Sequence, residues 1–250
     1  MGFDANLTPQ VMSEILQECH RREIPVVHDP TSLPKMLRIL PAIQSHQPTP
    51  SGRPLITHYT PNNLELKNLY DALRNKGLLE TDHWWQFIDS LQLDSDWRNS
   101  VERLAKRSGQ EWIGQEGVAQ MMVSLLPWVG NLWLKCSDKG VVYLGIQEDQ
   151  GTSASTSASK RTSTKAIHEL PPTTGRAPRR LVMAHYAAES LPSIVSTTGA
   201  GDSFVGGLLS QVNRRQDWTK SIDQIVNTAM GCAERSLVSE RAVGNVEALR

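Results

Sequence analysis

Residues 196–207 read Ser-Thr-Thr-Gly-Ala-Gly-Asp-Ser-Phe-Val-Gly-Gly, and this stretch decides the fold. The small residues from Gly199 to Gly201 let the backbone approach a ligand closely. The next apolar residues share one helical face: Phe204, Val205, Leu208, Leu209 and Val212. They predict a helix over about 202–214 whose free N–H groups and positive dipole end face a bound anion. Such a site suits a phosphoryl group in transfer, whose charge needs preorganised donors.

Asp202 has two interpretations. An aspartate in the first turn of a helix is a good cap, and it also accepts the proton of an attacking hydroxyl group. Gly206 and Gly207 favour the second, because each helix-interior glycine costs about 1 kcal/mol relative to alanine. Such glycines are expected where another backbone or a ligand packs very near.

The stretch from Thr198 to Gly207 resembles the C-terminal signature of the PfkB (ribokinase-like) carbohydrate kinase family. The resemblance implies an enzyme, an ATP-dependent kinase that uses Mg²⁺ and phosphorylates a hydroxyl group of a sugar or nucleoside. It implies that Asp202 is the catalytic base. It also implies that Gly199, Ala200 and Gly201, with Thr198, form the anion hole for the phosphate.

The rest of the chain alternates apolar runs with amphipathic segments. Strands are predicted near residues 25–28, 55–59, 132–136, 140–144 and 180–186, and helices near 8–19, 33–43, 62–77, 115–126 and 219–238. This alternation favours an α/β fold with helices on both faces of a parallel or mixed sheet. The resemblance specifies it as the ribokinase-like three-layer α/β/α sheet.

Asn62 and Glu65 stand three residues apart where a predicted strand gives way to a helix. They form an N-cap with an acidic first turn, or they resemble the Asn-x-x-Glu element of the same kinases. That resemblance implies that they help to organise Mg²⁺ and phosphate, often through water. Mg²⁺ keeps several waters, so sparse protein ligands are no objection.

The turn from Lys135 to Gly140 resembles the family's Thr-Leu-Gly-x-x-Gly turn beside the nucleotide, from which it departs at Lys135 and Ser137. The resemblance implies ATP contacts at Lys139 and Gly140, although a surface hairpin explains the turn as well. Asn227 and Gly231 lie on the helix that lines the adenine pocket in the family, and helix packing is the alternative for them. Asp29 ends a predicted strand, and we interpret it as mostly structural, with a role near substrate or metal as the alternative.

Two segments are interpreted as insertions in one partial kinase domain spanning 1–250. Residues 81–107 are rich in tryptophan and predict two short helices, with Trp84, Trp85, Phe87 and Leu91 covering a core. Residues 147–179 contain a Ser/Thr-rich run and are expected to form a disordered, low-complexity insertion. An interdomain linker is the alternative for the second segment.

The composition excludes several classes of protein. Lys plus Arg equals Asp plus Glu at 26 each, so bulk charge supports neither a nucleic-acid nor a membrane partner. No apolar run approaches a membrane span, and the three cysteines fit a reducing, cytoplasmic location rather than a disulfide framework. The histidines show no metal-ligand spacing, and no Gly-x-Gly-x-x-Gly motif supports a dinucleotide oxidoreductase.

Lys135 and the runs at 60–66 and 184–189 resemble the pseudouridine kinase branch, most of all the kinase half of fungal bifunctional proteins. Pseudouridine is therefore the preferred substrate, and a fused or separate glycosidase is an expected partner. The oligomeric state is left open. The resemblance covers about the C-terminal two-thirds of such a kinase, without the N-terminal strands and lid. We therefore expect poor solubility or partner-dependent folding, and a catalytically silent nucleotide-binding remnant is the alternative function.

Overall fold

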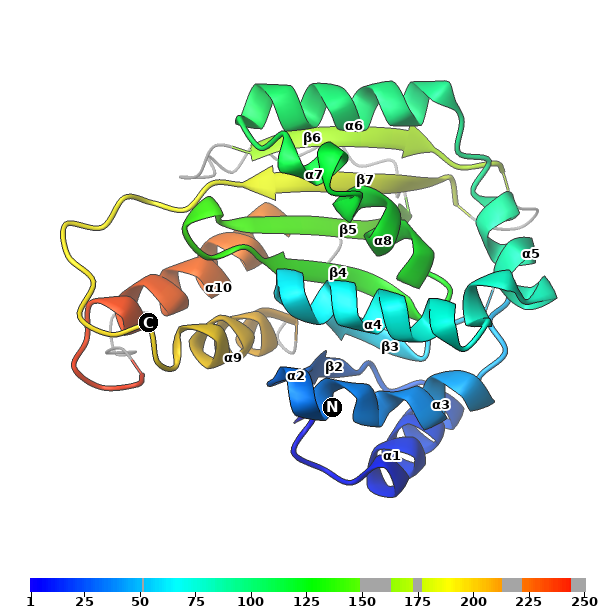
Figure 1. Cartoon of the computed structure of the whole chain (residues 1–250), viewed down its shortest axis with the longest axis horizontal. Coiled ribbons are helices and arrows are strands. Elements are labelled where there is room, and N and C mark those ends of the chain that lie inside the picture. Colours follow the sequence, from blue (N-terminus) through cyan, green and yellow to red (C-terminus); the bar gives the residue numbers. More distant parts are fainter. Residues whose placement is uncertain (51, 149–162, 173–176, 213–221, 244–250) are drawn as a thin grey trace. The chain divides into compact units, whose positions relative to one another are not determined.

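The computed structural model describes residues 1–50, 52–148, 163–172, 177–212 and 222–243. A seven-stranded sheet with the order β1-β2-β3-β4-β5-β7-β6 organises it (Figure 1). The strands are β1 (Gly2–Asp4), β2 (Val27–Asp29), β3 (Ile56–Tyr59), β4 (Val129–Lys135), β5 (Val141–Glu148), β6 (Ser163–Glu169) and β7 (Arg179–Tyr186). The pairs β1–β2, β2–β3 and β3–β4 are parallel. The five residues between β4 and β5 are too few for a parallel crossover, so the sheet is mixed, which confirms the α/β class.

The contacts divide the chain into two compact units. The first unit comprises Met1–Cys136, Val142–Gln150 and Thr164–His185. The second comprises Ser137–Val141, Gly151–Ser163 and Tyr186–Arg250.

Eight α-helices of the first unit lie between its parallel strands. They are α1 (Pro9–Arg21), α2 (Leu33–Met36), α3 (Leu40–Ser45), α4 (Asn63–Asn75), α5 (Asp82–Ser90), α6 (Ser95–Ser108), α7 (Trp112–Gln115) and α8 (Val118–Leu125). Short 3₁₀ turns occupy residues 37–39 and 78–80. The strand order advances in one direction from β1 to β4, so right-handed crossovers place the connecting helices on one face of the sheet. One apolar core joins that face to the helices, with Leu16, Leu66 and Leu132 among its members.

The tryptophan-rich segment forms α5 and α6, which confirms the two predicted helices. Trp84, Phe87 and Leu91 are buried in the core as expected. Trp85 is 49% exposed, so its expected part in the core is wrong. It points outward because it follows Trp84 by one residue, and adjacent helical positions face different directions.

Three further expectations need correction. The expected disordered insertion over 147–179 is wrong where strands form, because residues 147–148 end β5, residues 163–169 form β6 beside β7, and residue 179 begins β7. Residues 149–162 and 173–176 lie outside the described residues. β1 was not predicted, because three residues are too short to show a period. The helix predicted over 115–126 begins three residues later, as α8, because Gly117 with a φ of 69° separates it from α7, which ends at Gln115.

The second unit contains the helices α9 (Ala200–Val212) and α10 (Ile222–Leu237), which pack together. A β-carbon at Gly207 would lie 2.8 Å from Cα of Ala229, so the close backbone approach expected at this glycine is confirmed. A β-carbon at Gly206 would meet nothing within 4 Å, so packing among the described residues does not explain that glycine. Within the described part of the chain, no helix is long and apolar enough to cross a membrane.

Candidate active site

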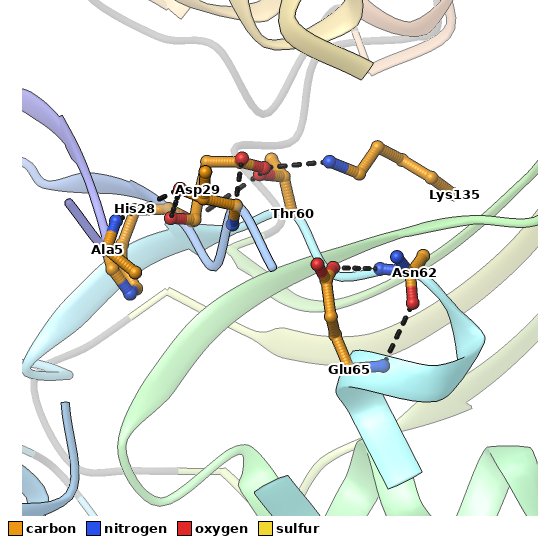
Figure 2. Close-up of polar contacts among 8 residues, drawn as sticks. Ala5, His28, Asp29, Thr60, Asn62, Glu65 and Lys135 are labelled. Atoms are coloured by element: carbon orange, nitrogen blue, oxygen red, sulfur yellow. Dashed lines mark hydrogen bonds and ion pairs between the residues drawn. The ribbon is translucent and has the colours of Figure 1, made fainter. Parts of the chain in front are cut away.

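Three polar side chains meet at the carboxyl ends of parallel strands in the first unit. Asp29 ends β2, Thr60 follows β3 and Lys135 ends β4. The ammonium Nζ of Lys135 lies 2.7 Å from Oδ1 of Asp29, and the Thr60 hydroxyl donates to the same oxygen at 2.6 Å (Figure 2). Ligands of open α/β sheets bind outside the carboxyl ends of strands. We call these three residues the strand-end cluster.

Asn62 and Glu65 form a complete capping box at the start of α4. The Glu65 N–H donates to Oδ1 of Asn62 at 2.9 Å, and the Asn62 N–H donates to Oε2 of Glu65 at 2.8 Å. Glu65 is 3% exposed. Burial raises the pKa of its carboxyl group, while the Asn62 hydrogen bond and the positive charge of Lys135 act in the opposite direction. The N-cap interpretation is therefore confirmed, and the carboxylate also lies within the electrostatic reach of Lys135.

The oxygens of this capping box fit Mg²⁺ through water better than by direct coordination. One oxygen of each side chain is already engaged in the cap. Among the described residues, no group of three or more His, Cys, Asp or Glu side chains is placed to hold a metal ion. Mg²⁺ prefers oxygen donors and keeps several waters, so a water-mediated role for Asn62 and Glu65 agrees with this donor set.

Backbone contacts tie Lys135 to the capping box. The Lys135 N–H donates to the Pro61 carbonyl at 2.8 Å, and Asn62 pairs with Lys135 in an isolated parallel bridge. The next residue, Cys136, is buried, with Sγ 3.4 Å from the Leu134 carbonyl oxygen and 3.6 Å from Oδ1 of Asn63. The end of β4 is therefore fixed against the start of α4.

The glycine-acid turn, Thr198 to Asp202, lies in the second unit. Gly199 adopts a φ of 82°, and a β-carbon there would collide with the carbonyl oxygen of Ala242. The Thr198 N–H donates to Oγ of Ser196 at 3.2 Å, and the Ser203 N–H donates to the Gly199 carbonyl at 2.8 Å. Only glycine at position 199 permits this path of the backbone.

Helix α9 begins at Ala200, two residues before the predicted start, so Ala200, Gly201 and Asp202 form its first turn. N–H groups in a first turn have no acceptor within the helix, and they carry the positive end of the helix dipole. Asp202 and Gly201 are exposed. The turn therefore combines backbone donors with a carboxylate that solvent or a ligand reaches.

The turn after β4 also belongs to the second unit. Ser137 to Lys139 form a 3₁₀ turn, and Lys139 is exposed. Gly140 has a φ of 90°, and a β-carbon there would collide with the carbonyl oxygen of Tyr186 and lie 2.7 Å from the Ala188 nitrogen. The predicted tight turn is confirmed, and Gly140 fixes it against the backbone after β7.

Asn227 and Gly231 lie four residues apart on α10, and both are partly buried. Residues spaced by four share a helix face. A β-carbon at Gly231 would meet nothing within 4 Å, so close helix packing does not account for this glycine. ATP binding by Asn227 and Gly231 stays a prediction.

The predicted site residues thus fall into two groups. Asn62 and Glu65 lie in the first unit, and Lys139, Gly140, Thr198, Gly199, Ala200, Gly201, Asp202, Asn227 and Gly231 lie in the second. Sequence reasoning missed the pairing of Asp29 with Lys135 and Thr60. The available signal was that each of the three residues ends or follows a predicted strand.

Comparisons with known proteins agree with this architecture. Residues 183–242 match the model of the pfkB family carbohydrate kinases. Over 239 residues, the chain is 28% identical to a pseudouridine-metabolizing bifunctional protein of Schizosaccharomyces pombe. The match covers 94% of this chain and 28% of that protein, so the chain spans less than a third of this relative.

Solved structures share the fold at low sequence identity. A ribokinase of Arabidopsis thaliana, complexed with ribose and ATP, matches with a TM-score of 0.51 and 12% identity, over 98% of this chain and 52% of that one. An adenosine kinase of Sinorhizobium meliloti matches with a TM-score of 0.50 and 14% identity, over 98% of this chain and 50% of that one. The chain therefore has a ribokinase-like α/β fold, and its residues 183–242 carry the signature of the pfkB family carbohydrate kinases.

Proposed function

We propose that this chain supplies the phosphoryl-transfer machinery of an ATP-dependent kinase that acts on a hydroxyl group of a sugar or nucleoside. The glycine-acid turn carries the proposal, because it joins first-turn N–H donors to the exposed carboxylate of Asp202. The family match at 183–242 includes this turn.

Each residue has a role in the proposed reaction. Asp202 accepts the proton of the acceptor hydroxyl group, whose oxygen attacks the terminal phosphorus of ATP. The bond from that phosphorus to the bridging oxygen breaks, and ADP leaves with the bridging oxygen. The N–H groups of Gly199, Ala200 and Gly201, beside Thr198, stabilise the charge on the transferring phosphoryl group. Lys139 and Gly140, with Asn227 and Gly231, hold the nucleotide.

Asn62 and Glu65 hold waters around Mg²⁺ in this proposal. When bound, Mg²⁺ neutralises charge on the phosphate oxygens. The buried carboxylate of Glu65 is held in place by the capping box, so its free oxygen keeps a fixed direction. A rigid acceptor of this kind suits an ordered water.

Pseudouridine is the substrate that we propose within this class. The support is the relative from Schizosaccharomyces pombe, whose name states that it metabolizes pseudouridine and is bifunctional. A fused or separate glycosidase partner belongs to the same proposal.

Replacing Asp202→Asn tests the catalytic role. Asparagine keeps the size of the side chain but cannot accept the proton, so transfer of labelled phosphate from ATP to pseudouridine should fall about 10²- to 10⁴-fold. ATP binding, measured by calorimetry, should stay close to that of the parent. Asp82→Asn is the matched control, because Asp82 is also an exposed acid in a first helical turn, that of α5.

The result also separates the two candidate functions. Unchanged turnover in Asp202→Asn contradicts the assignment of the base. A parent chain that binds ATP but transfers phosphate to no sugar or nucleoside is instead the nucleotide-binding remnant.

A further inference from the structure

A groove in the first unit has no part in the proposed reaction. Its volume is about 780 Å³, and residues of α6, α7 and α8 line it (Figure 1). Trp97, Val101 and Ala105 form an apolar wall along α6, and Val123 adds to the lining from α8. The ring of Trp97 also meets His168 of β6 edge to face, so this wall is held in place. The groove is therefore a fixed apolar surface within one unit.

The remaining lining fits a protein partner better than a small ligand. Small residues, Gly114, Gly117 and Ala119, form part of the wall opposite α6. A β-carbon at Gly114 or Gly117 would meet nothing within 4 Å, so there is space beside both. The charged and amide residues that line the groove are all exposed, so they form a polar rim rather than buried groups that orient a small molecule.

A row of exposed charges follows the α6 side of this rim. The row consists of residues spaced by four, which share one helical face: Asp94, Arg98, Glu102 and Lys106. Alternating charges at this spacing can pair within their own helix, as Lys67 and Asp71 do at 2.7 Å in α4. The ion pairs among the described residues include none from the α6 row. Its charges therefore remain available to a partner.

The order of these charges is self-complementary. When two copies of α6 lie antiparallel, Asp94 of each copy lies opposite Lys106 of the other, and Arg98 lies opposite Glu102. Both pairings share one centre, because positions 94 and 106 and positions 98 and 102 are each symmetric about position 100. One two-fold axis beside this position therefore places every charge of the row opposite a charge of the other sign. A two-fold dimer uses the same surface on both subunits, which requires this kind of symmetry.

We propose that the groove is the interface of a homodimer in which two α6 helices pack antiparallel about this axis. The apolar wall supports the same axis, because Val101 lies midway between Trp97 and Ala105, one position from the centre of the charges. The second copy covers the apolar wall, and the charges surround it as a rim. This inference concerns assembly, so it goes beyond the proposed kinase function and does not depend on it.

Sedimentation of the full chain over a dilution series tests the inference. The parent should form a dimer that dissociates on dilution. Arg98→Glu and Glu102→Arg each place like charges opposite one another at two symmetry-related positions, so each should raise the dimer Kd about 10- to 100-fold. Both positions are exposed, so the melting temperatures of the variants show that they still fold. Arg103→Glu is the matched control, because Arg103 is an exposed arginine of α6 that does not line the groove.

A mixture of the two single variants distinguishes this dimer from other modes of association. In an antiparallel mixed pair, the new glutamate at position 98 lies opposite the new arginine at position 102, and the unchanged Glu102 lies opposite the unchanged Arg98. The mixture should therefore form a heterodimer with a Kd close to that of the parent, and the double variant Arg98→Glu/Glu102→Arg should associate with itself again.

Three results overturn the inference. One is a parent that stays monomeric over the whole series, which leaves the groove to a different occupant. Another is a pair of single variants that dimerise as the parent does, which assigns the association to another surface. The third is a mixture that stays monomeric, which excludes the antiparallel pairing.

Discussion

The strand-end cluster with its capping box and the glycine-acid turn are built by opposite means. In the first, side chains from three strand ends and a helix start are buried and bonded to each other. In the second, the backbone supplies the donors, glycine supplies the path, and the carboxylate of Asp202 is exposed. Side-chain substitutions and protonation should therefore damage the first region, and added β-carbons should damage the second.

Acid should produce the largest effect, on the strands that carry the cluster. Burial lowers the pKa of His28 on β2 to about 4 and that of His58 on β3 to about 3, against an ordinary value of 6.5. The unfolded chain therefore takes up protons first, and stability present above about pH 6.5 is lost as the pH falls toward 4. The loss is on the order of 3 kcal/mol for each residue.

Thermal unfolding between pH 8 and pH 4 measures this loss. His28→Phe keeps a ring between Phe3 and Tyr59 but does not titrate, so its melting temperature should fall less steeply with pH than that of the parent. Above pH 7, the melting temperatures of the two proteins should change with pH at the same rate. Identical slopes across the whole range contradict the assignment.

Gly199→Ala should produce the second largest effect, in the glycine-acid turn. The φ of 82° and the collision with the Ala242 carbonyl oxygen force the turn to shift, at a cost of about 1–3 kcal/mol. Hydrogen exchange of residues 195–212 should accelerate, and phosphate transfer should fall with it.

Gly206→Ala is the control for Gly199→Ala, because a β-carbon at Gly206 meets nothing within 4 Å. Alanine is favoured by about 1 kcal/mol inside a helix, so this variant should unfold at a higher temperature. If Gly206→Ala is less stable than the parent, or if Gly199→Ala is as stable as the parent, then the space around the backbone does not explain the glycines of this turn.

Ser137→Gly should produce the smallest effect, and it should stabilise. Ser137 adopts a φ of 55°, which a residue with a β-carbon disfavours, and the related family turn has glycine at this position. Glycine relieves this strain in the folded state but also raises the conformational entropy of the unfolded chain. The first effect should be larger, so the free energy of unfolding should rise by about 0.5–1 kcal/mol. Chemical denaturation detects the gain, and Ser100→Gly within α6 should show a loss instead.

The two regions also differ in how well sequence predicts them. The glycine-acid turn is contiguous, so the residues from Thr198 to Asp202 could be assigned from one stretch of sequence. The strand-end cluster joins residues 106 positions apart, and nothing local shows that Asp29 accepts from Lys135. The capping box lies between these cases, because Asn62 and Glu65 are three residues apart, and the predicted N-cap proves to be part of a reciprocal pair of hydrogen bonds.

The helices and strands show the same contrast between features that local sequence predicts and features that depend on distant contacts. Segments with a clear period, such as α4 and α10, were predicted to within a few residues. β1 was missed because its three residues show no period and its pairing with β2 is a tertiary contact. β6 was missed because a polar edge strand resembles a loop in composition, and only its neighbour β7 orders it.

The buried thiol of Cys136, next to Lys135, is a built-in reporter of the strand-end cluster. A thiol reagent reaches a buried sulfur only when the surrounding backbone opens, so the labelling rate of Cys136 measures how often the end of β4 separates from α4. A ligand that binds the cluster should slow the labelling of Cys136. The labelling rate of the more accessible Cys232 on α10 serves as the internal reference. Mass spectrometry of labelled peptides thus gives a readout of site occupancy that requires neither turnover nor a known substrate.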